Sequence, residues 1–275
     1  MNNIRMERHD GVGIIEIARR GHFNSLDVES AQDLRKAGLQ MARDRMVSVV
    51  ILRGQGGVFC SGADLKYIRN GGQEGELSYL RPEDREPGHG PAFKQILEYL
   101  HSTISEIRRA PKPFIAMVDG PAAAGGFGLA MACDLVLASE RSWFEWAYFK
   151  TGLTGAESST FMLPRLLGFR RAMELVLLSP RVGAQQALDL GLINRVYPDA
   201  LLETETLAMA RQLAGRPAAA VAVAKRLING AAGMDRLDTH LDLELDELAR
   251  AASGPEVAEG MEAFFAKRTP EFKGH

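Results

Sequence analysis

Hydrophobic residues along the first half of the chain form short continuous runs separated by longer stretches with helical periodicity. The apolar, β-branched runs predict strands at residues 13–18, 47–52, 114–118 and 134–139. Periodic apolar positions between them predict helices at residues 27–45 and 91–109. Strands that alternate with helices in this way favour parallel βα units, so we expect an α/β fold.

The second half of the chain has an almost entirely helical pattern. From residue 158 the periodicity predicts helices at residues 160–167, 170–178, 184–190, 201–214, 218–231, 236–252 and 255–267. A helical tail of this length is too short to build a second full core. We therefore expect it to dock on the first layer and on neighbouring subunits.

One segment follows neither pattern. Residues 70–90 are rich in glycine, proline and charge and carry few apolar side chains, so they lack the apolar area that would offset their ordering entropy. They form either a tolerated surface insertion or a mobile lid. Long loops in compact domains often cover sites, and this one directly follows a small-residue loop described below, which favours the lid.

Composition narrows the class of protein. The chain has 275 residues and a formal net charge of −2, which gives no general argument for binding nucleic acid or an anionic membrane. Its two cysteines, Cys60 and Cys133, fit small buried residues in a reducing cytosol. The charged N-terminal residues are not a secretory signal, and no apolar run is long enough to span a bilayer. We expect a cytoplasmic protein.

Two short loops carry the candidate chemistry. Residues 58–65 (VFCSGADL) and 118–128 (VDGPAAAGGFG) each follow an apolar run and lead into a predicted helix. This layout aims unpaired backbone N–H groups, with a helix dipole behind them, at whatever occupies the loop. Two such donors can hold one developing oxyanion. The competing interpretation is close packing of helix on sheet. Neither loop matches the dinucleotide or P-loop patterns.

The two loops, in this order, resemble the signatures of the crotonase (enoyl-CoA hydratase/isomerase) superfamily. The resemblance continues in residues 110–116 (APKPFIA), 131–135 (MACDL), 184–194 (AQQALDLGLIN) and 259–268 (EGMEAFFAKR), and so covers nearly the whole chain. It is closest to the ring-1,2-epoxyphenylacetyl-CoA isomerase branch. It implies a spiral ββα crotonase-like core over residues 1–198 and a C-terminal helical oligomerisation region over residues 199–275. It also implies a homotrimer or a dimer of trimers.

The resemblance implies specific oxyanion donors. The residue after the glycine of the first loop supplies one N–H group, which assigns Ala63, and the second donor corresponds to Gly125. Both act through the backbone. The chemistry they imply is stabilisation of a thioester enolate, or of a tetrahedral adduct at that carbonyl.

The acid/base positions depart from the family. Hydratases share two glutamates, and those positions, aligned without gaps from Asp134, correspond to Gly128 and Tyr148 here. Neither residue is a carboxylate base. We therefore expect an isomerase rather than a two-glutamate hydratase.

Other members of the superfamily carry an aspartate further along, at the position of Ala156, and Glu157 follows it here. Glu157 is either the catalytic carboxylate, displaced by one residue, or an ordinary residue in the first turn of a helix. Burial beside an acyl chain would raise its pKa and suit it to moving protons.

Two further residues are candidates for the site. Tyr148 is either a hydrogen-bond donor and weak acid or part of an acyl pocket wall with Trp146 and Phe149. His101 lies at the edge of the apolar stripe of the helix at residues 91–109. A histidine at the matching place lies near the site in dehalogenase-like members, whereas a lone histidine on such a face is more often structural.

Coenzyme A enters only as part of the substrate, and we expect no permanently bound cofactor. By resemblance, Lys66 meets the nucleotide phosphates, as does Lys267 from a neighbouring subunit, and His22 occupies a third such position. The scattered histidines predict no metal site. The alternatives to an isomerase are a non-catalytic acyl-CoA-binding homologue and a dehalogenase-like hydrolase. The latter needs a nucleophilic carboxylate where Ala156 stands.

Overall fold

The computed structural model of the protein describes residues 3–72 and 89–272. Most of the predicted lid, residues 73–88, lies outside the described residues, so the lid stays a prediction. A mixed sheet forms the centre of the molecule. Its strand order is β1 (Ile4–His9), β2 (Val12–Ile17), β3 (Val49–Gly54), β4 (Phe114–Val118), β6 (Leu135–Ser139) and β9 (Arg195–Tyr197).

Strand direction in this sheet follows the predicted βα alternation. Strand β1 is antiparallel to β2, and every later neighbouring pair is parallel. A second, smaller sheet joins β5 (Pro121–Ala123), β7 (Trp143–Glu145) and β8 (Val182–Gly183). The short strands β5, β7, β8 and β9 and the edge strand β1 were not among the predicted strands, and they correct that part of the prediction.

The central strands are apolar on both faces because both faces are covered. In β3, Val50 and Leu52 belong to the larger core, while Val49 and Ile51 point into a smaller core on the opposite face. Helix α9 (Leu202–Ala214) covers that smaller core. Because successive side chains of a strand point to opposite faces of the sheet, one continuous apolar run contributes to both cores.

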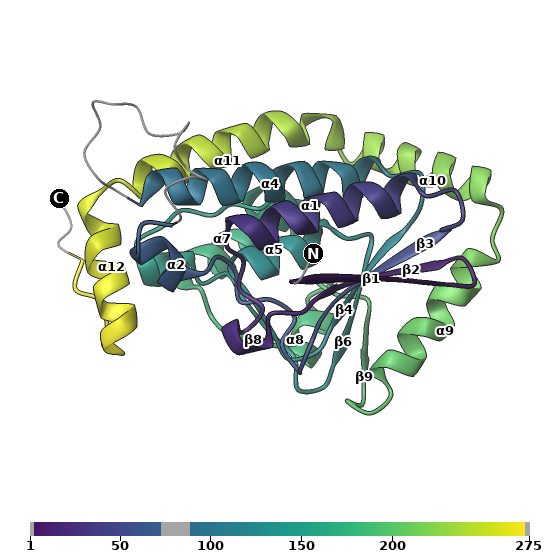
Figure 1. The fold of residues 1–275 in the computed structure, drawn as a ribbon, viewed down its shortest axis with the longest axis horizontal. Helices are drawn as coiled ribbons and strands as arrows, with labels where there is room; N and C mark the ends of the chain where they lie inside the picture. The colour runs from purple at the N-terminus through teal and green to yellow at the C-terminus, as the bar shows by residue number, and fades with distance from the viewer. Residues whose placement is uncertain (1–2, 73–88, 273–275) are drawn as a thin grey trace.

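Three long helices lie side by side on the larger core. Helix α4 (Gly90–Arg109) packs between α1 (Val28–Arg43) and α11 (Leu237–Ala251), as Figure 1 shows along one side of the molecule. Asp27 caps α1 in a capping box with Ser30, each side chain accepting the other's backbone N–H at 2.9 Å. Helix α11, from the C-terminal part of the chain, therefore lies in the same layer as α1 and α4.

The remaining helices are α2 (Leu65–Arg69), α5 (Gly125–Ala132), α6 (Ser159–Leu167), α7 (Phe169–Leu178), α8 (Ala184–Asp189), α10 (Ala218–Ala231) and α12 (Pro255–Ala266). Side chains of α11 and α12, such as Leu241 and Val257, belong to the same core as the sheet. The predicted α/β class with a C-terminal helical region is confirmed. The division at residue 198 and the oligomerisation role stay predictions.

Helix α5 is buried along its whole length, which explains its composition. All of its residues, GGFGLAMA, are buried, and small residues allow it to lie close to its neighbours.

Both cysteines are free and buried, as the sequence indicated. In the part of the chain that the structure describes, no helix is long and apolar enough to cross a membrane.

Candidate active site

The two small-residue loops are joined by backbone hydrogen bonds. The N–H groups of Phe59 and Cys60 donate to the Pro121 carbonyl at 3.0 and 3.2 Å, and the Ala123 N–H donates to the Cys60 carbonyl at 3.0 Å. The first loop thus runs beside β5, which leads directly into α5. This pairing brings Ala63 and Gly125 to neighbouring places.

Local pairing also sets the direction of the Ala63 amide. Leu26 donates its N–H to the Gly62 carbonyl and accepts the Asp64 N–H, both at 2.8 Å. In a parallel bridge of this kind the residue between the two partners turns its own N–H the other way. The Gly125 N–H is the first of α5 and so has no acceptor within its helix. Across residues 3–72 and 89–272, neither amide donates to a protein acceptor.

Close approach explains why the loops need glycine. Gly62 has φ +92°, and a Cβ there would lie 3.0 Å from the Gly125 nitrogen. A Cβ on Gly125 would lie 2.8 Å from Oε1 of Glu157. The Glu157 carboxyl is therefore packed against the second predicted oxyanion donor.

Glu157 sits in a buried turn, held by groups from two other elements. Its side chain is 3% exposed. The Tyr148 hydroxyl, from the 3₁₀ turn Tyr148–Thr151, donates to Oε2, and the Glu157 N–H donates to Nε2 of His101 on α4 at 3.2 Å. The structure thus brings together the three residues that the sequence proposed for proton chemistry. Their catalytic roles stay predictions.

The turn itself has an unusual backbone. Glu157 and Ser158 have φ values of +50° and +62°, in the left-handed region that non-glycine residues seldom adopt. Glu157 precedes the N-cap of α6 and lies outside the helix, so the interpretation as an ordinary first-turn residue is wrong. Such conformations persist only where surrounding contacts enforce them.

Burial controls protonation in the cluster. Burial raises the pKa of Glu157 to about 8, the Tyr148 hydrogen bond opposes that shift, and the charge of Glu244 adds to it. Burial lowers the pKa of His101 to about 3, so its imidazole is neutral. Burial also raises the pKa of Tyr148 well above its usual value. Glu157 is thus the member of this trio that changes protonation near neutral pH.

Tyr148 contacts both Glu157 and an aromatic cluster, and its place in an acyl pocket wall stays a prediction. Its hydroxyl contacts Glu157, while its ring centroid lies 4.9 Å from that of Trp146. The Trp146 ring in turn lies 4.8 Å from Phe149, and its indole N–H donates to Ser159. The aromatic residues therefore form one cluster behind the carboxyl.

The structure leaves no room for a side chain at Gly128. A Cβ at this position would lie 2.3 Å from the Glu157 carbonyl oxygen and 2.7 Å from the Glu157 Cβ. These separations are shorter than any that real Cβ atoms adopt. The turn that carries Glu157 therefore occupies the space that a side chain at residue 128 would need.

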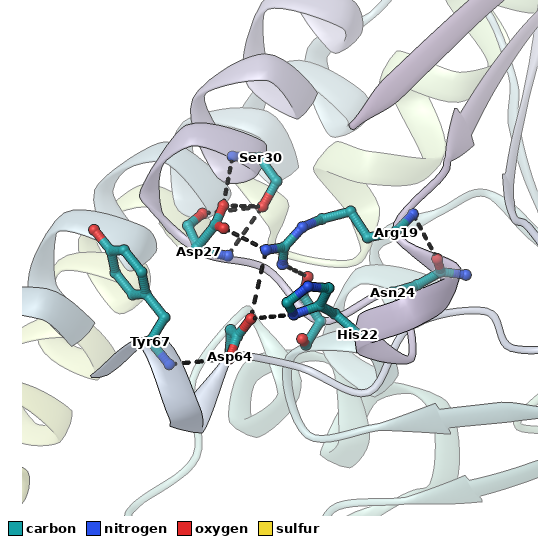
Figure 2. A network of polar contacts seen from close by, with 8 residues as sticks. Arg19, His22, Asn24, Asp27, Ser30, Asp64 and Tyr67 are labelled. Carbon is teal, nitrogen blue, oxygen red and sulfur yellow. Dashed lines mark hydrogen bonds and ion pairs between the residues drawn. The ribbon is translucent and has the colours of Figure 1, made fainter. Parts of the chain in front are cut away.

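A buried arginine connects the first loop to α1. The Arg19 guanidinium contacts the Ser25 carbonyl and Asp27, and lies 3.4 Å from Oδ2 of Asp64 (Figure 2). Asp64 also caps α2 by accepting the Tyr67 N–H at 3.1 Å. Asp64 directly follows Ala63, so this network holds the loop that carries the first oxyanion donor. Arg19 was not among the residues predicted from the sequence.

The three basic residues expected to meet phosphates lie on the surface. His22 is exposed and its Nδ1 is 3.2 Å from Oδ2 of Asp64 (Figure 2). Lys66 is exposed on α2, and Lys267 is exposed at the end of α12. Helices α2 and α12 meet where Arg69 stacks 3.6 Å from the Phe265 ring. The three phosphate contacts stay predictions.

The described residues hold no group of three or more histidine, cysteine or acidic side chains that could bind a metal ion.

One buried acidic residue near the site, Glu244 on α11, was not predicted from the sequence. A signal existed, because Glu244 takes an apolar position in the buried stripe of Leu237, Leu241 and Leu248. In the charged sequence LDLELDELAR, that position is easily taken for a solvated one.

The chain is similar to known proteins over nearly its whole length. A family model described as enoyl-CoA hydratase/isomerase matches residues 7–275. The 1,2-epoxyphenylacetyl-CoA isomerase of Escherichia coli (strain K12) is 34% identical over 264 residues, which cover 96% of this chain and 95% of that protein. The 4-chlorobenzoyl coenzyme A dehalogenase-2 of an Arthrobacter species is 30% identical over 266 residues, 97% of this chain and 91% of the relative.

A solved structure agrees with these sequence matches. The crystal structure of an enoyl-CoA hydratase from Mycobacterium avium subsp. paratuberculosis K-10 matches with a TM-score of 0.85 and 32% identity, covering 99% of both chains. The resemblance carried by the two loops is therefore confirmed. The protein is an acyl-CoA-processing enzyme, and the chain belongs to the enoyl-CoA hydratase/isomerase family of the crotonase superfamily.

Proposed function

We propose that the protein is an acyl-CoA isomerase that shuttles a proton with one carboxyl group. The observation that carries this proposal is the placement of the Glu157 carboxyl against Gly125, where an added Cβ would lie 2.8 Å from Oε1. Gly128 and Tyr148 supply no carboxylate at the two positions where a hydratase has glutamates. Proton transfer between carbons needs a single acid/base group, whereas addition of water by the hydratase route uses two.

In the proposed reaction, the amides of Ala63 and Gly125 hold the thioester oxygen. The Glu157 carboxylate takes a proton from a carbon conjugated with the thioester, and the electron pair moves onto that oxygen as an enolate. The resulting carboxylic acid returns the proton to a different carbon. The Tyr148 hydroxyl donates to the carboxylate and supports its charged form. Substrate and product have the same composition, so no other reactant is consumed.

A panel of enoyl-, dienoyl- and aryl-CoA thioesters tests this reaction. Products are separated by liquid chromatography and weighed by mass spectrometry, in ordinary water and in heavy water. We expect a product of unchanged mass with a new retention time, which gains deuterium when solvent exchanges with Glu157. A mass gain of one water, or replacement of chlorine by hydroxyl on a chlorinated aryl-CoA, would contradict isomerisation. Binding without turnover across the panel would favour a non-catalytic acyl-CoA-binding protein.

The proposal also covers how the substrate is bound, how the subunits assemble and where the protein is found. We infer that His22, Lys66 and Lys267 contact the phosphates of the coenzyme A portion of the substrate, and that no cofactor is permanently bound. We also infer a homotrimer or dimer of trimers in the cytoplasm. Exposed apolar side chains on α7 and α10 support subunit contacts, and they include Phe169, Leu178, Leu227 and Ile228.

Removing the Tyr148 hydroxyl is expected to shift the pH profile to higher pH. The hydroxyl stabilises the charged form of Glu157, so Tyr148→Phe raises the pKa of that carboxyl further above 8. A hydrogen bond to a charged group contributes about 1.5–3 kcal/mol, which corresponds to about one to two pH units. The measurement is kcat/KM from pH 6 to 10. Phe149→Leu, which changes a neighbouring aromatic residue without touching this bond, is the control. An unmoved acidic limb would contradict the role.

A further inference from the structure

Glu244 is a buried acid on a helix far along the chain from the site. It is 4% exposed and lies among the buried residues of α11. Helix α11 packs against α4 (Figure 1). Burying an ionised carboxyl without partners is costly, so its contacts are informative. None of the roles assigned above uses this residue for the reaction.

The contacts of Glu244 are the amides at the start of α6. Its Oε2 accepts the Ser158 N–H at 2.8 Å, and its Oε1 accepts the Thr160 N–H at 3.0 Å and the Thr160 hydroxyl. These amides have no acceptor within their own helix, and the helix dipole there favours a negative charge. Ser158, the N-cap residue, makes no capping bond with its own side chain. A carboxylate from another helix replaces the usual cap.

These bonds hold the backbone turn that carries Glu157. Glu157 and Ser158 both have left-handed conformations, which are unfavourable for residues with a side chain. His101 accepts the N–H of Glu157, and Glu244 accepts the N–H of Ser158, so both strained residues are fixed. Fixing this turn presses the Glu157 side chain against Gly125.

Most of the titratable groups that face Glu157 and Glu244 do not change protonation near neutral pH. His101 is neutral, Tyr148 stays protonated, and burial raises the pKa of the Cys60 thiol to about 12. Burial raises the pKa of Glu244 to about 7, and the charge of Glu244 adds to the burial that raises the pKa of Glu157.

His240 lies beside Glu244, and Arg165 lies near His240. Nε2 of His240 is 2.8 Å from the Thr160 hydroxyl and 3.6 Å from Glu244. Burial lowers the pKa of His240, and the nearby Arg165 charge lowers it further. A neutral His240 leaves the charge of Glu244 uncancelled.

We propose that Glu244 is a positioning residue for Glu157: it fixes the Glu157–Ser158 turn through the amides of α6 and places a second negative charge behind the reacting carboxyl. This inference rests on the proposed function, in which Glu157 moves the proton. Glu244 acts through Glu157 and need not touch the substrate.

The test compares Glu244→Gln and Glu244→Ala with Glu247→Gln. Glu247 lies on the same helix, has a side chain that is 45% exposed and pairs with Arg250 at 3.0 Å, so it serves as the matched control. Glutamine keeps an acceptor and removes the charge, so the acidic limb of kcat/KM is expected to move down by about one pH unit. Alanine also removes both acceptors and is expected to lower kcat by about tenfold or more, with KM changed less.

A second readout does not depend on turnover. The carboxyl carbons of glutamate are labelled with ¹³C, and the Glu157 signal, identified by its loss in Glu157→Gln, is titrated by NMR. The expected result is a lower Glu157 midpoint in Glu244→Gln and an unchanged one in Glu247→Gln. An unchanged Glu157 midpoint in folded Glu244→Gln would overturn the proposal. If instead Glu157→Gln keeps full activity while the midpoint still moves, the proposed function fails and the coupling stands. Thermal melts confirm that each variant is folded.

Discussion

Glu157→Gln is expected to lower kcat by about 10²–10⁴-fold, the range that a positioned acid/base group contributes. Glutamine has nearly the same shape but cannot take or return a proton. The amides of Ala63 and Gly125 are untouched, so affinity for the thioester should change little. Steady-state kinetics on the substrate identified by the panel measure kcat, and isothermal titration calorimetry with a product thioester measures affinity.

The control is Glu174→Gln, an exposed position on α7, which should leave kcat unchanged. Glu157→Gln should also be more stable than the wild type at pH 8 and nearly equal to it below pH 4.5. The pKa of Glu157 is raised from 4.5 to about 8, so between these values the unfolded chain binds fewer protons than the folded one. The free energy of unfolding therefore falls as the pH rises through this window. Full turnover in the variant would remove Glu157 from the mechanism.

Gly128→Ala is expected to damage both the fold and the reaction. The added Cβ would meet the Glu157 carbonyl oxygen at 2.3 Å, and backbone cannot move aside as a flexible side chain can. Overpacking of this kind costs about 1–3 kcal/mol of unfolding free energy, and a displaced reacting group can cost about 10²-fold in rate. Denaturant unfolding and kcat/KM measure the two effects.

Gly183→Ala is the matched control for this substitution. An added Cβ there meets nothing within 4 Å, and the backbone has φ −69°, which alanine accepts. It should leave kcat/KM unchanged. Wild-type stability and activity in Gly128→Ala would show that the close approach of Gly128 and Glu157 is not maintained in solution.

Much of the fold could be predicted because local patterns decide it. The predicted helix at residues 218–231 matches α10 at both ends, and the run at 114–118 is β4. The edge strand β1 was missed because its sequence, IRMERH, mixes charged and apolar residues on an exposed edge. Strands β5 and β7 are three residues each and exist through their pairing with each other, which no local pattern reveals.

The sequence suggested individual candidate residues for the site, but it did not predict that they lie together. The family resemblance assigned Ala63 and Gly125 as candidate donors, and single positions suggested Glu157, Tyr148 and His101. Their meeting depends on a left-handed turn at two non-glycine residues, which sequence propensity disfavours. It also depends on Glu244, which is 86 residues from the Ser158 amide that it holds. Contacts of that range are set by tertiary packing rather than by spacing along the chain.

The contact between Gly128 and Glu157 has an evolutionary consequence. A side chain at residue 128 and the present turn at residue 157 exclude each other. A glutamate gained at residue 128 would collide with that turn, so this exchange alone is expected to destabilise the fold. The order of mutations is therefore constrained. A change that relaxes the turn at residue 157 must precede a glutamate at residue 128 or arrive together with it.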